Sequence, residues 1–368
     1  MKRIIHIITD LNNGGAEKML YKLLKNSDKD KYYHEVISLI DEGIYGEKIK
    51  ALNIKVHCLK INKSNLLISL LKARKICKSF DVVDTWLYHA DFLGFIIAKI
   101  LLNKKLIWNI RHCNLDKDAN KLRTLKIVKA NSFLSRYVNH LIFNSNKALD
   151  NHLRFGYKNK KLKVIPNGFE LDIFRYSKND REKIRELLNI NSGEKVLITV
   201  GRWDIQKDYY TLIKSLNELK KRNPHFKMIM CGNKLDVTNE ELTNLISRYG
   251  LKEKVLLLGP QNDIPALLSA ADVYVSSSLG ESFSNAIGEA MACELPCVVT
   301  DVGDSRIIVG DTGKVVEAKN YIELANSILS ILNNECLMGR NEPARSRVIE
   351  NYDIKAIIKV FEYVWNEN

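Results

Sequence analysis

Short apolar runs rich in β-branched residues alternate with longer segments whose apolar residues recur at helical spacing. In the first half of the chain these runs predict strands, and the segment at 16–25 between the first two has the spacing of a helix. The strand candidates are RIIHIIT (3–9), HEVISLI (34–40), IKVHCL (54–59), DVVDTWL (81–87), KLIWNI (105–110) and HLIFNS (140–145). A Pro-Asn-Gly turn in KLKVIPNG (161–168) closes this first series.

The same alternation then begins again. Strands are predicted at 194–202, 226–232, 254–259, 272–278 and 295–301, the last of these being the final core strand that the pattern supports. Helices are predicted at 208–222, 242–250, 264–271 and around Glu289. Two runs of strand–helix alternation predict two α/β domains with parallel sheets, joined near residues 166–180.

Size and composition agree with this organisation. A chain of 368 residues with 46% hydrophobic residues can bury two cores. The longest apolar stretch, 90–102, is too short to span a bilayer, and the first apolar run ends at Asp10, too early for a signal peptide.

Of seven cysteines, only Cys293 and Cys297 are close in sequence, and no second pair completes a zinc site. Reduced thiols, no secretion and no transmembrane anchor are therefore expected.

Charge divides unevenly along the chain. Residues 1–150 hold 27 Lys and Arg against 14 Asp and Glu, whereas residues 151–368 hold 30 against 29. Such asymmetry suggests that the first half faces an anionic partner, either nucleic acid or a membrane. Two segments, 64–80 and 120–142, mix basic and apolar residues at helical spacing. They fit membrane-surface helices and equally fit ordinary lysine-rich surface helices.

Three loops lie where α/β domains bind ligands, at the carboxyl ends of predicted strands. In TDLNNGGAEK (9–18), Gly14 and Gly15 allow close approach to a ligand before a helix, although a tight turn would need them too. In VGRWDIQKDY (200–209), Arg202 and Lys207 could neutralise a diphosphate, or could belong to a solvated basic loop.

The third loop, in LGESFSNAIGEAMACELP (279–296), combines acids with a helix start. Ser284 is a plausible N-cap residue, and the amides that follow it would favour a phosphate. Glu281 precedes this cap, and Glu289 lies in the second turn, where a carboxylate can accept hydrogen bonds from vicinal hydroxyls. The arrangement predicts a helix start that holds an anionic leaving group and acids that hold hydroxyls.

These motifs, in this order, resemble the GT4 family of retaining glycosyltransferases. The resemblance rests on NNGGAE (12–17), NSNKAL (144–149), VIPNGFE (164–170), VGRWDIQKD (200–208) and ESFSNAIGEAMACELPCVVTDVG (281–303). It implies a GT-B fold with an N-terminal acceptor-side Rossmann-like domain at 1–168 and a C-terminal nucleotide-sugar-binding domain at 169–352. The last helix, about 353–368, would pack back on the first domain.

The resemblance also implies roles for single residues. Arg202 and Lys207 would hold the donor diphosphate, Glu289 the ribose and Glu281 the donor sugar. The implied donor-binding residues are Gly14, Gly15, Arg202, Lys207, Glu281, Phe283, Ser284, Asn285, Ala286 and Glu289. The implied acceptor-side residues are His89, Asp91, Arg111 and His112, and the catalytic candidates are Glu281, His112, Arg202 and Lys207. A lone histidine such as His112 is equally often a packing residue.

The implied reaction moves a sugar with retention from a nucleotide sugar, most simply a UDP-sugar, to a lipid-linked or growing-glycan acceptor in cell-surface polysaccharide synthesis. No cofactor or metal is expected, although Asp28–Asp30 and Asp116–Asp118 are pairs that could ligate a cation. The expected site of action is the cytoplasmic face of the membrane. Ser282 and Ser284 replace glycines that are common in the family, which leaves the donor's identity open. A sugar-nucleotide epimerase and a nucleic-acid-binding protein are the alternatives.

Overall fold

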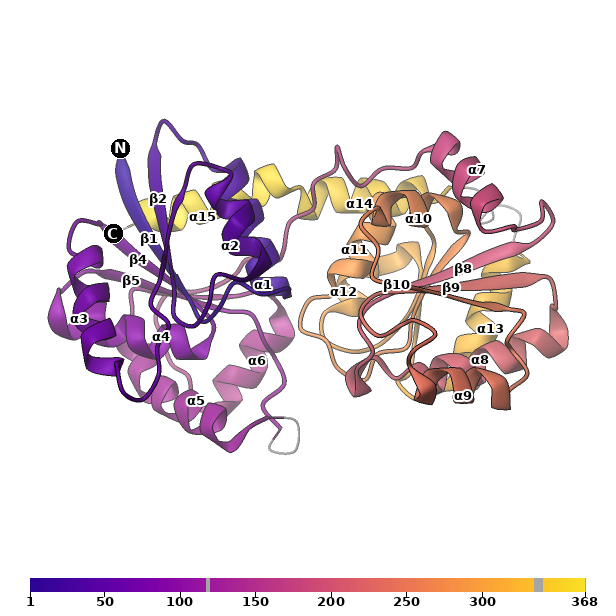
Figure 1. Ribbon diagram of the computed structural model, residues 1–368, viewed down its shortest axis with the longest axis horizontal. Coiled ribbons are helices and arrows are strands. Elements are labelled where there is room, and N and C mark those ends of the chain that lie inside the picture. Colours follow the sequence, from indigo (N-terminus) through magenta and orange to yellow (C-terminus); the bar gives the residue numbers. More distant parts are fainter. Residues whose placement is uncertain (117–119, 334–339, 368) are drawn as a thin grey trace. The chain divides into compact units, whose positions relative to one another are not determined.

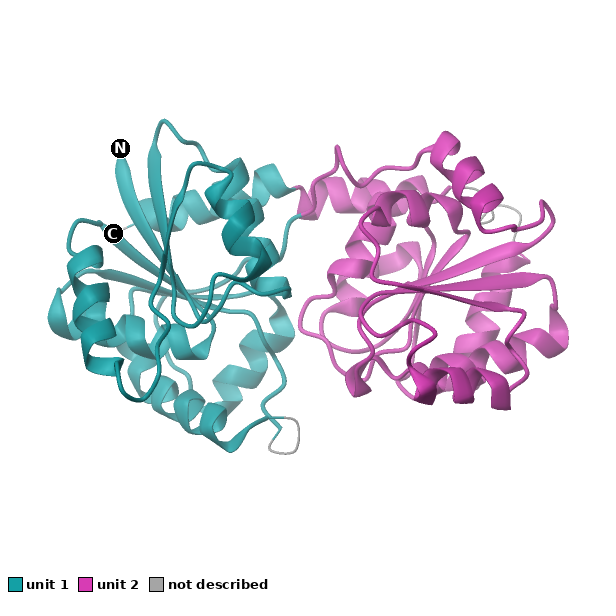
Figure 2. Ribbon diagram, in the orientation of Figure 1, with its two compact units in different colours: residues 1–168, 354–368 teal, residues 169–353 magenta. Residues whose placement is uncertain are grey.

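The computed structural model describes residues 1–116, 120–333 and 340–367. The chain forms two compact units, the first made of residues 1–168 with 354–368 and the second of residues 169–353 (Figure 2). Each unit has its own parallel sheet covered by helices (Figure 1). The predicted fold class, two parallel-sheet α/β domains, is confirmed.

Within residues 1–116 and 120–168, unit 1 contains a seven-stranded parallel sheet of order β3-β2-β1-β4-β5-β6-β7. The order reverses direction between β1 and β4, which therefore form the switch point of the unit, where open α/β sheets bind ligands. The strands are β1 (Lys2–Ile8), β2 (Tyr32–Ser38), β3 (Lys55–Cys58), β4 (Val82–Trp86), β5 (Lys105–Ile110), β6 (His140–Phe143) and β7 (Leu162–Val164).

Helices cover both faces of this sheet. The C-terminal helix of the chain belongs to the same unit, although more than 180 residues of unit 2 separate it from β7 in sequence. The helices are α1 (Gly15–Asn26), α2 (Gly43–Lys50), α3 (Leu66–Cys77), α4 (Tyr88–Phe95), the π-helix η1 (Ile96–Leu101), α5 (Leu122–Leu134), the 3-10 helix η2 (Ser135–Tyr137), α6 (Asn146–Phe155) and α15 (Ile354–Asn366).

The packing of α15 explains why it returns to unit 1. Its apolar residues Ile357, Phe361 and Trp365 are almost completely buried in the core that contains β1 and β4. The Phe361 ring stacks on Trp86 with a centroid separation of 6.0 Å. The Trp365 indole N–H donates to Asp84 Oδ2 at 3.1 Å, so the buried carboxylate is partnered from the helix.

Among the described residues of unit 2, six strands form a parallel sheet of order β10-β9-β8-β11-β12-β13, with its switch point between β8 and β11. The sequence pattern placed the last core strand at 295–301, which contains the buried β12, but it did not predict the edge strand β13 that follows. β13 is a three-residue edge strand that is partly exposed, so it has too few apolar residues to be detected. The strands are β8 (Lys195–Val200), β9 (Phe226–Cys231), β10 (Val255–Gly259), β11 (Val273–Ser276), β12 (Cys297–Thr300) and β13 (Lys314–Val316).

The helices of unit 2 cover its sheet in the same way. One of them, α11, follows β11 at the switch point and is almost entirely buried. The helices are α7 (Lys178–Leu187), the 3-10 helix η3 (Ile205–Lys207), α8 (Tyr209–Arg222), α9 (Glu240–Arg248), α10 (Ile264–Ala270), α11 (Asn285–Ala292), α12 (Ser305–Val309), the 3-10 helix η4 (Gly310–Thr312), α13 (Tyr321–Leu332) and α14 (Glu342–Tyr352).

Candidate active site

The loops that follow β8 and β11 are tied together at the switch point of unit 2. The Ser277 hydroxyl lies 2.9 Å from the carbonyl oxygens of both Lys207 and Asp208. The Leu279 N–H donates to the carbonyl of Gln206 at 2.7 Å. Because β8 and β11 are neighbours, their carboxyl ends bring the 202–208 segment beside the 277–284 segment. Two of the predicted motifs are thereby joined in one place.

The central contact of this site is between Lys207 and Glu281. The Lys207 ammonium group donates to Glu281 Oε1, and the Ser278 hydroxyl donates to the same oxygen at 2.8 Å. Both charged side chains are mostly buried, with 22% and 13% of their surface exposed. An ion pair protected from water is held more firmly than a surface pair, so the ammonium group occupies a defined position.

Arg202 lies in the same loop but has a different partner. Its guanidinium Nε donates to Asp204 Oδ2 at 2.9 Å, and 63% of the side chain is exposed. Burial alone would raise the pKa of Asp204, but hydrogen bonds from the Gln206 N–H and from Arg202 lower it, which favours the ionised carboxylate. The structure therefore brings Lys207 and Glu281 into contact and leaves Arg202 with Asp204.

The helix start that follows Glu281 is fixed by its aromatic residue. Ser284 occupies the N-cap position of α11, as predicted, but its side chain makes no capping hydrogen bond. Phe283 is buried, stacks on Phe169 at 6.2 Å and meets Tyr352 edge-on at 5.5 Å. The loop is thus anchored through its phenylalanine, and the first turn of α11 presents amides that have no partners within the helix.

Glu289 lies in the second turn of α11 and is 4% exposed. Asn285 and Ala286 form the first turn of the same helix. The loop between β12 and α12 packs closely against the backbone of Glu281. A side chain on Gly303 of this loop would lie 2.3 Å from the Glu281 carbonyl oxygen, so only glycine fits there. The predicted donor residues of unit 2 therefore occupy two loops and one helix at a single switch point.

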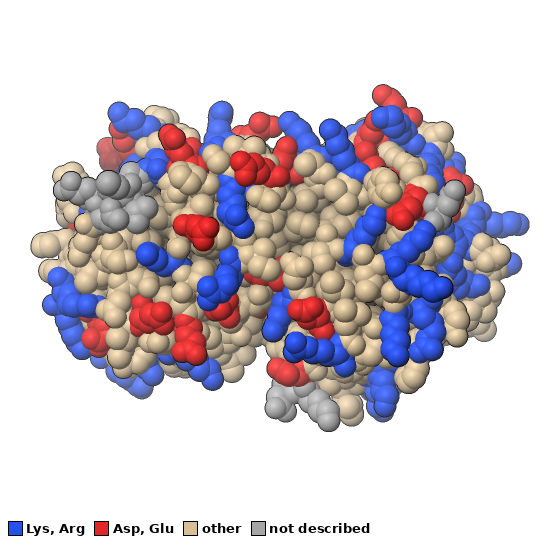
Figure 3. All heavy atoms as spheres, turned by 180° about the vertical axis from the view of Figure 1, so that it is seen from behind, with Lys and Arg blue, Asp and Glu red and all other residues tan. Residues whose placement is uncertain are grey.

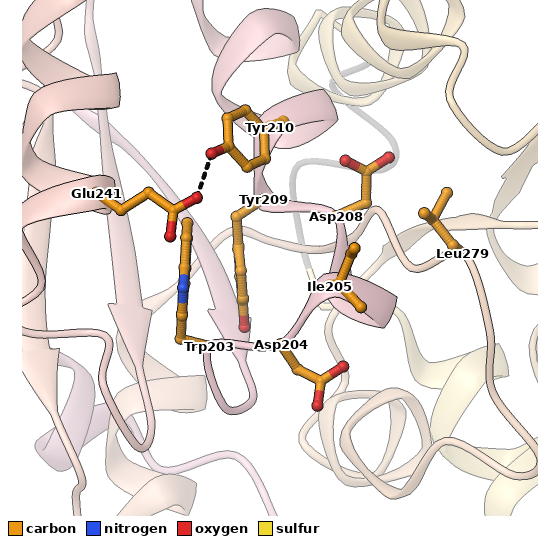
Figure 4. A pocket seen from close by; sticks show the side chains of 8 residues that line it. All are labelled: Trp203, Asp204, Ile205, Asp208, Tyr209, Tyr210, Glu241 and Leu279. Atoms are coloured by element: carbon orange, nitrogen blue, oxygen red, sulfur yellow. Dashed lines mark hydrogen bonds between the residues drawn. The ribbon is translucent and has the colours of Figure 1, made fainter. Parts of the chain in front are cut away.

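A pocket of about 440 Å³ lies beside the 202–208 loop (Figure 4). Trp203 and Tyr209 stack inside it with ring centroids 5.5 Å apart, and the Tyr210 hydroxyl donates to Glu241. Neither Lys207 nor Glu281 lines the pocket. The pocket is therefore separate from the ion pair, although the same loop shapes both.

In unit 1, the predicted glycine loop follows β1 at the switch point of that sheet. Gly14 is the N-cap residue of α1 and Gly15 its first residue. A side chain at Gly14 would lie 2.2 Å from Glu17 Oε2, so the carboxyl group of Glu17 fills the space beneath the glycine. Burial raises the pKa of Glu17 to about 7. A hydrogen bond from the residue's own N–H opposes this shift, and the negative charge of Asp10 adds to it.

Arg111, an acceptor-side candidate, is buried within unit 1. Its guanidinium group donates to Asn167 Oδ1 and to Asn109 Oδ1, both at 3.2 Å, and lies 4.6 Å from the centroid of the Trp86 ring. Burial lowers the pKa of Arg111 to about 9. The guanidinium group therefore links the end of β5 to the segment that follows β7, and these contacts give Arg111 a structural role.

The other acceptor-side candidates have different surroundings. Asp91 is fully buried and bonded by the Thr85 hydroxyl, and burial raises its pKa well above the ordinary value. The Asp91 carboxyl group is therefore enclosed by the protein and has no exposed surface toward an acceptor. His89 and His112 are half-buried, and burial lowers the pKa of His89. The His112 ring meets the edge of Tyr88 at 6.5 Å, and the Tyr88 hydroxyl bonds to His152 Nε2 at 2.8 Å.

Comparison with known proteins gives the family. A model described as "Glycosyltransferase Family 4" matches residues 13–173, and one described as "Glycosyl transferases group 1" matches residues 180–354. The chain belongs to these glycosyltransferase families. Both models describe transferases, so the epimerase and nucleic-acid alternatives are not supported.

Two relatives of the glycosyltransferase are matched over most of their length. One is the UDP-Gal:alpha-D-GlcNAc-diphosphoundecaprenol alpha-1,3-galactosyltransferase of Escherichia coli, 24% identical with 84% of this chain and 81% of the relative covered. The other is the N-acetylgalactosamine-N,N'-diacetylbacillosaminyl-diphospho-undecaprenol 4-alpha-N-acetylgalactosaminyltransferase of Campylobacter jejuni, 25% identical with 92% of each covered. The crystal structure of Anabaena Alr3699/HepE in complex with UDP matches with a TM-score of 0.88 at 23% identity, covering 100% of both chains, which shows the same fold.

The sequence alone did not indicate several polar residues of the candidate site. Ser277 and Ser278 bind the 207–208 carbonyls and Glu281, but they were interpreted as the tail of a strand. The available signal was a run of three serines, 276–278, at the carboxyl end of a buried strand. Glu17 was quoted within a motif, and its position three residues after Gly14 gave no sign that it would be buried.

The possible metal sites and the cysteines can also be placed. Among the described residues, no group of three His, Cys, Asp or Glu side chains is arranged to hold a metal ion. Asp28 pairs with Lys31 at 2.8 Å near the surface. The Asp116–Asp118 pair extends outside the described residues. Cys293 and Cys297 are buried, and burial raises the pKa of both thiols.

Proposed function

We propose that the protein is a retaining, metal-independent glycosyltransferase of cell-surface polysaccharide synthesis. It would transfer a hexose or N-acetylhexosamine from a UDP-sugar to a lipid-linked or growing-glycan acceptor. The observation that carries the proposal is the contact between Lys207 and Glu281 at the switch point of unit 2, beside the start of α11. The names of the Escherichia coli and Campylobacter jejuni relatives, which include diphospho-undecaprenol acceptors, support the lipid-linked class.

The reaction breaks the bond between the anomeric carbon and the diphosphate. Negative charge grows on the departing diphosphate, where the Lys207 ammonium group and the first-turn amides of α11 can stabilise it. Arg202 is exposed and held by one hydrogen bond to Asp204, so rotation of its side chain can add a second cation. Two cations and a helix start supply the charge stabilisation that a divalent metal supplies in other transferases.

In this proposal Glu281 positions the Lys207 ammonium group and the donor sugar, and it does not act as a nucleophile. Its carboxylate orients Lys207 and accepts the Ser278 hydroxyl. In the proposal, the same carboxylate also meets a hydroxyl of the donor sugar, because Glu281 lies just before the start of α11. Retention is attributed to attack on the same face from which the diphosphate leaves, with a phosphate oxygen taking the acceptor's proton. Glu289 would hold the ribose, and His112 with His89 would face the acceptor.

The proposed location is the cytoplasmic face of the membrane, reached by peripheral attachment. Figure 3 shows Lys and Arg side chains gathered over part of unit 1, the unit whose sequence carries most of the positive charge. Each cation near an anionic leaflet contributes about 1 kcal/mol, so several can hold a protein at the surface. Among the described residues, no helix has both the length and the hydropathy to cross a bilayer.

A panel of UDP-, GDP- and ADP-sugars tests the proposal through release of the nucleoside diphosphate. Release from a UDP-sugar is expected, increased by a bacterial lipid extract and unchanged by EDTA. Loss of release in EDTA that returns with added Mg²⁺ would contradict metal independence. Equal release with and without any acceptor, yielding free sugar or an epimer, would contradict transfer.

A further inference from the structure

Helix α3 presents four large aliphatic side chains to solvent, whereas Leu70 and Ile76 pack partly against the core of unit 1. Its fully buried residues are Ser69, Ala73 and Cys77, which recur every four positions and face the core of unit 1. Four aliphatic residues near its start are exposed by about half or more: Leu66 (47%), Leu67 (69%), Ile68 (70%) and Leu71 (55%). A helix on a water-soluble surface normally has the opposite arrangement.

The neighbouring π-helix extends this apolar surface. η1 packs against α3, and it exposes 67% of Ile100 and 36% of Leu101. The apolar patch therefore comes from two elements that are adjacent in space and separated by β4 and α4 in sequence. Contiguous exposed apolar patches mark interaction surfaces.

The segment of sequence that contains α3 carries charge of one sign. From residue 48 to residue 80 the chain contains nine Lys and Arg and no Asp or Glu. Four of these cations lie in the second half of α3 or just after it, and all four are exposed: Lys72, Arg74, Lys75 and Lys78. The helix thus begins with exposed leucines and ends with exposed cations.

We propose that α3 and η1 form a lipid-binding face that inserts its aliphatic side chains into an anionic bilayer. The proposal rests on the membrane location proposed above and names the surface responsible. Apolar groups flanked by cations match the boundary between acyl chains and anionic headgroups, and the long Lys and Arg side chains can reach the headgroups while their stems lie along the apolar surface. A second copy of this chain is a poor occupant because the same positive surface would face itself.

Vesicle sedimentation tests this surface in the full-length protein without donor or acceptor. The probes are phosphatidylcholine vesicles with and without phosphatidylglycerol. The Leu67→Gln/Ile68→Gln double variant should bind phosphatidylglycerol vesicles at least about 10-fold more weakly than wild type, because two apolar side chains no longer leave water. The matched control is Leu187→Gln/Val237→Gln, which changes residues of unit 2 that are 71% and 75% exposed and should bind like wild type.

Charge and insertion can be separated in the same assay. The Lys72→Gln/Lys75→Gln variant should bind about fivefold more weakly for each charge at low salt, and this difference should shrink at high salt. The aliphatic variant should keep its defect at high salt. Equal binding of the aliphatic variant and its control would overturn the proposal, as would a wild-type dimer that Leu67→Gln/Ile68→Gln converts to a monomer.

The proposed activity is measured separately. Release of nucleoside diphosphate with a short, water-soluble acceptor should be unchanged in the aliphatic variant, because α3 contributes no residue of the candidate site. A variant that loses vesicle binding but keeps this release supports the lipid-binding face. A wild-type protein that binds vesicles through α3 yet releases no nucleoside diphosphate would support the face while contradicting the proposed function.

Discussion

At the scale of single residues, the site depends on charged groups placed where water is scarce. Lys207 and Glu281 form an ion pair at the unit 2 switch point. Glu17 lies beside Gly14 at the unit 1 switch point, and no positively charged group is among those that shift its pKa. The sequence indicated Lys207 and Glu281 because both follow predicted strands. It could not indicate the environment of Glu17, because burial of a first-turn glutamate depends on how the whole loop packs.

Glu17 gives a prediction for stability against pH. Its pKa is about 7 in the folded protein, whereas the ordinary value for a glutamate is about 4.5. The folded state therefore holds a proton that the unfolded state has released, so the free energy of unfolding should fall as the pH rises from about 4.5 to about 7. The Glu17→Gln variant should not show this contribution, which is at most about 3 kcal/mol.

Urea unfolding of both proteins between pH 4.5 and pH 8 measures the difference. The variant should gain stability relative to wild type across this interval and then keep a constant advantage. Two stability curves that run parallel over the whole range would show that Glu17 titrates normally in the folded protein.

At the scale of elements, sequence patterns located the interior strands well and the edges poorly. KLIWNI at 105–110 matches β5 residue for residue, because a central strand buried on both faces is a continuous apolar run. β13 was missed because an edge strand of three partly exposed residues has no such signature. Ser284 was correctly placed at the start of α11, but the anchor of that loop is Phe283, which only tertiary packing reveals.

The close packing of α11 against Phe169 gives a prediction at this scale. A methyl group on Gly288 would lie 2.1 Å from the Phe169 ring, so Gly288→Ala must push the helix away from its core. We expect a loss of about 1–3 kcal/mol in the unfolding free energy of unit 2, together with reduced turnover, because the proposed donor site includes the amides at the start of α11. Gly193→Ala is the control, since nothing lies within 4 Å of its added methyl group. Equal stability of the two variants by chemical denaturation would contradict this packing.

At the scale of the whole molecule, the chain builds unit 1 from both of its ends. Only the family resemblance indicated a last helix at about 353–368 and the domain on which it packs. The reason is physical: an amphipathic helix needs an apolar partner, and its sequence does not say which core supplies one. The positive charge of the first half was visible from composition, whereas the exposed leucines of α3 required the structure.

The contribution of α15 can be measured by one substitution. Phe361 is fully buried against Trp86, so Phe361→Ala should destabilise unit 1 by about 3–5 kcal/mol. Val360 on the same helix is 41% exposed, and Val360→Ala should cost far less. Thermal unfolding should show a lower transition for Phe361→Ala alone. A wild-type melting curve for that variant would mean that α15 does not stabilise unit 1.

The most direct test of the account is the turnover number for nucleoside-diphosphate release after Lys207→Ala, measured with the donor that the panel identifies. The same assay on Lys221→Ala, which removes an exposed lysine from α8, provides the control. We expect a loss of about 10²–10³-fold for Lys207→Ala, because the cation acts on charge that develops as the diphosphate leaves, and no loss for Lys221→Ala. Turnover of Lys207→Ala within about twofold of wild type would contradict the central role given to the Lys207–Glu281 pair, since that change is far below the effect of a transition-state contact.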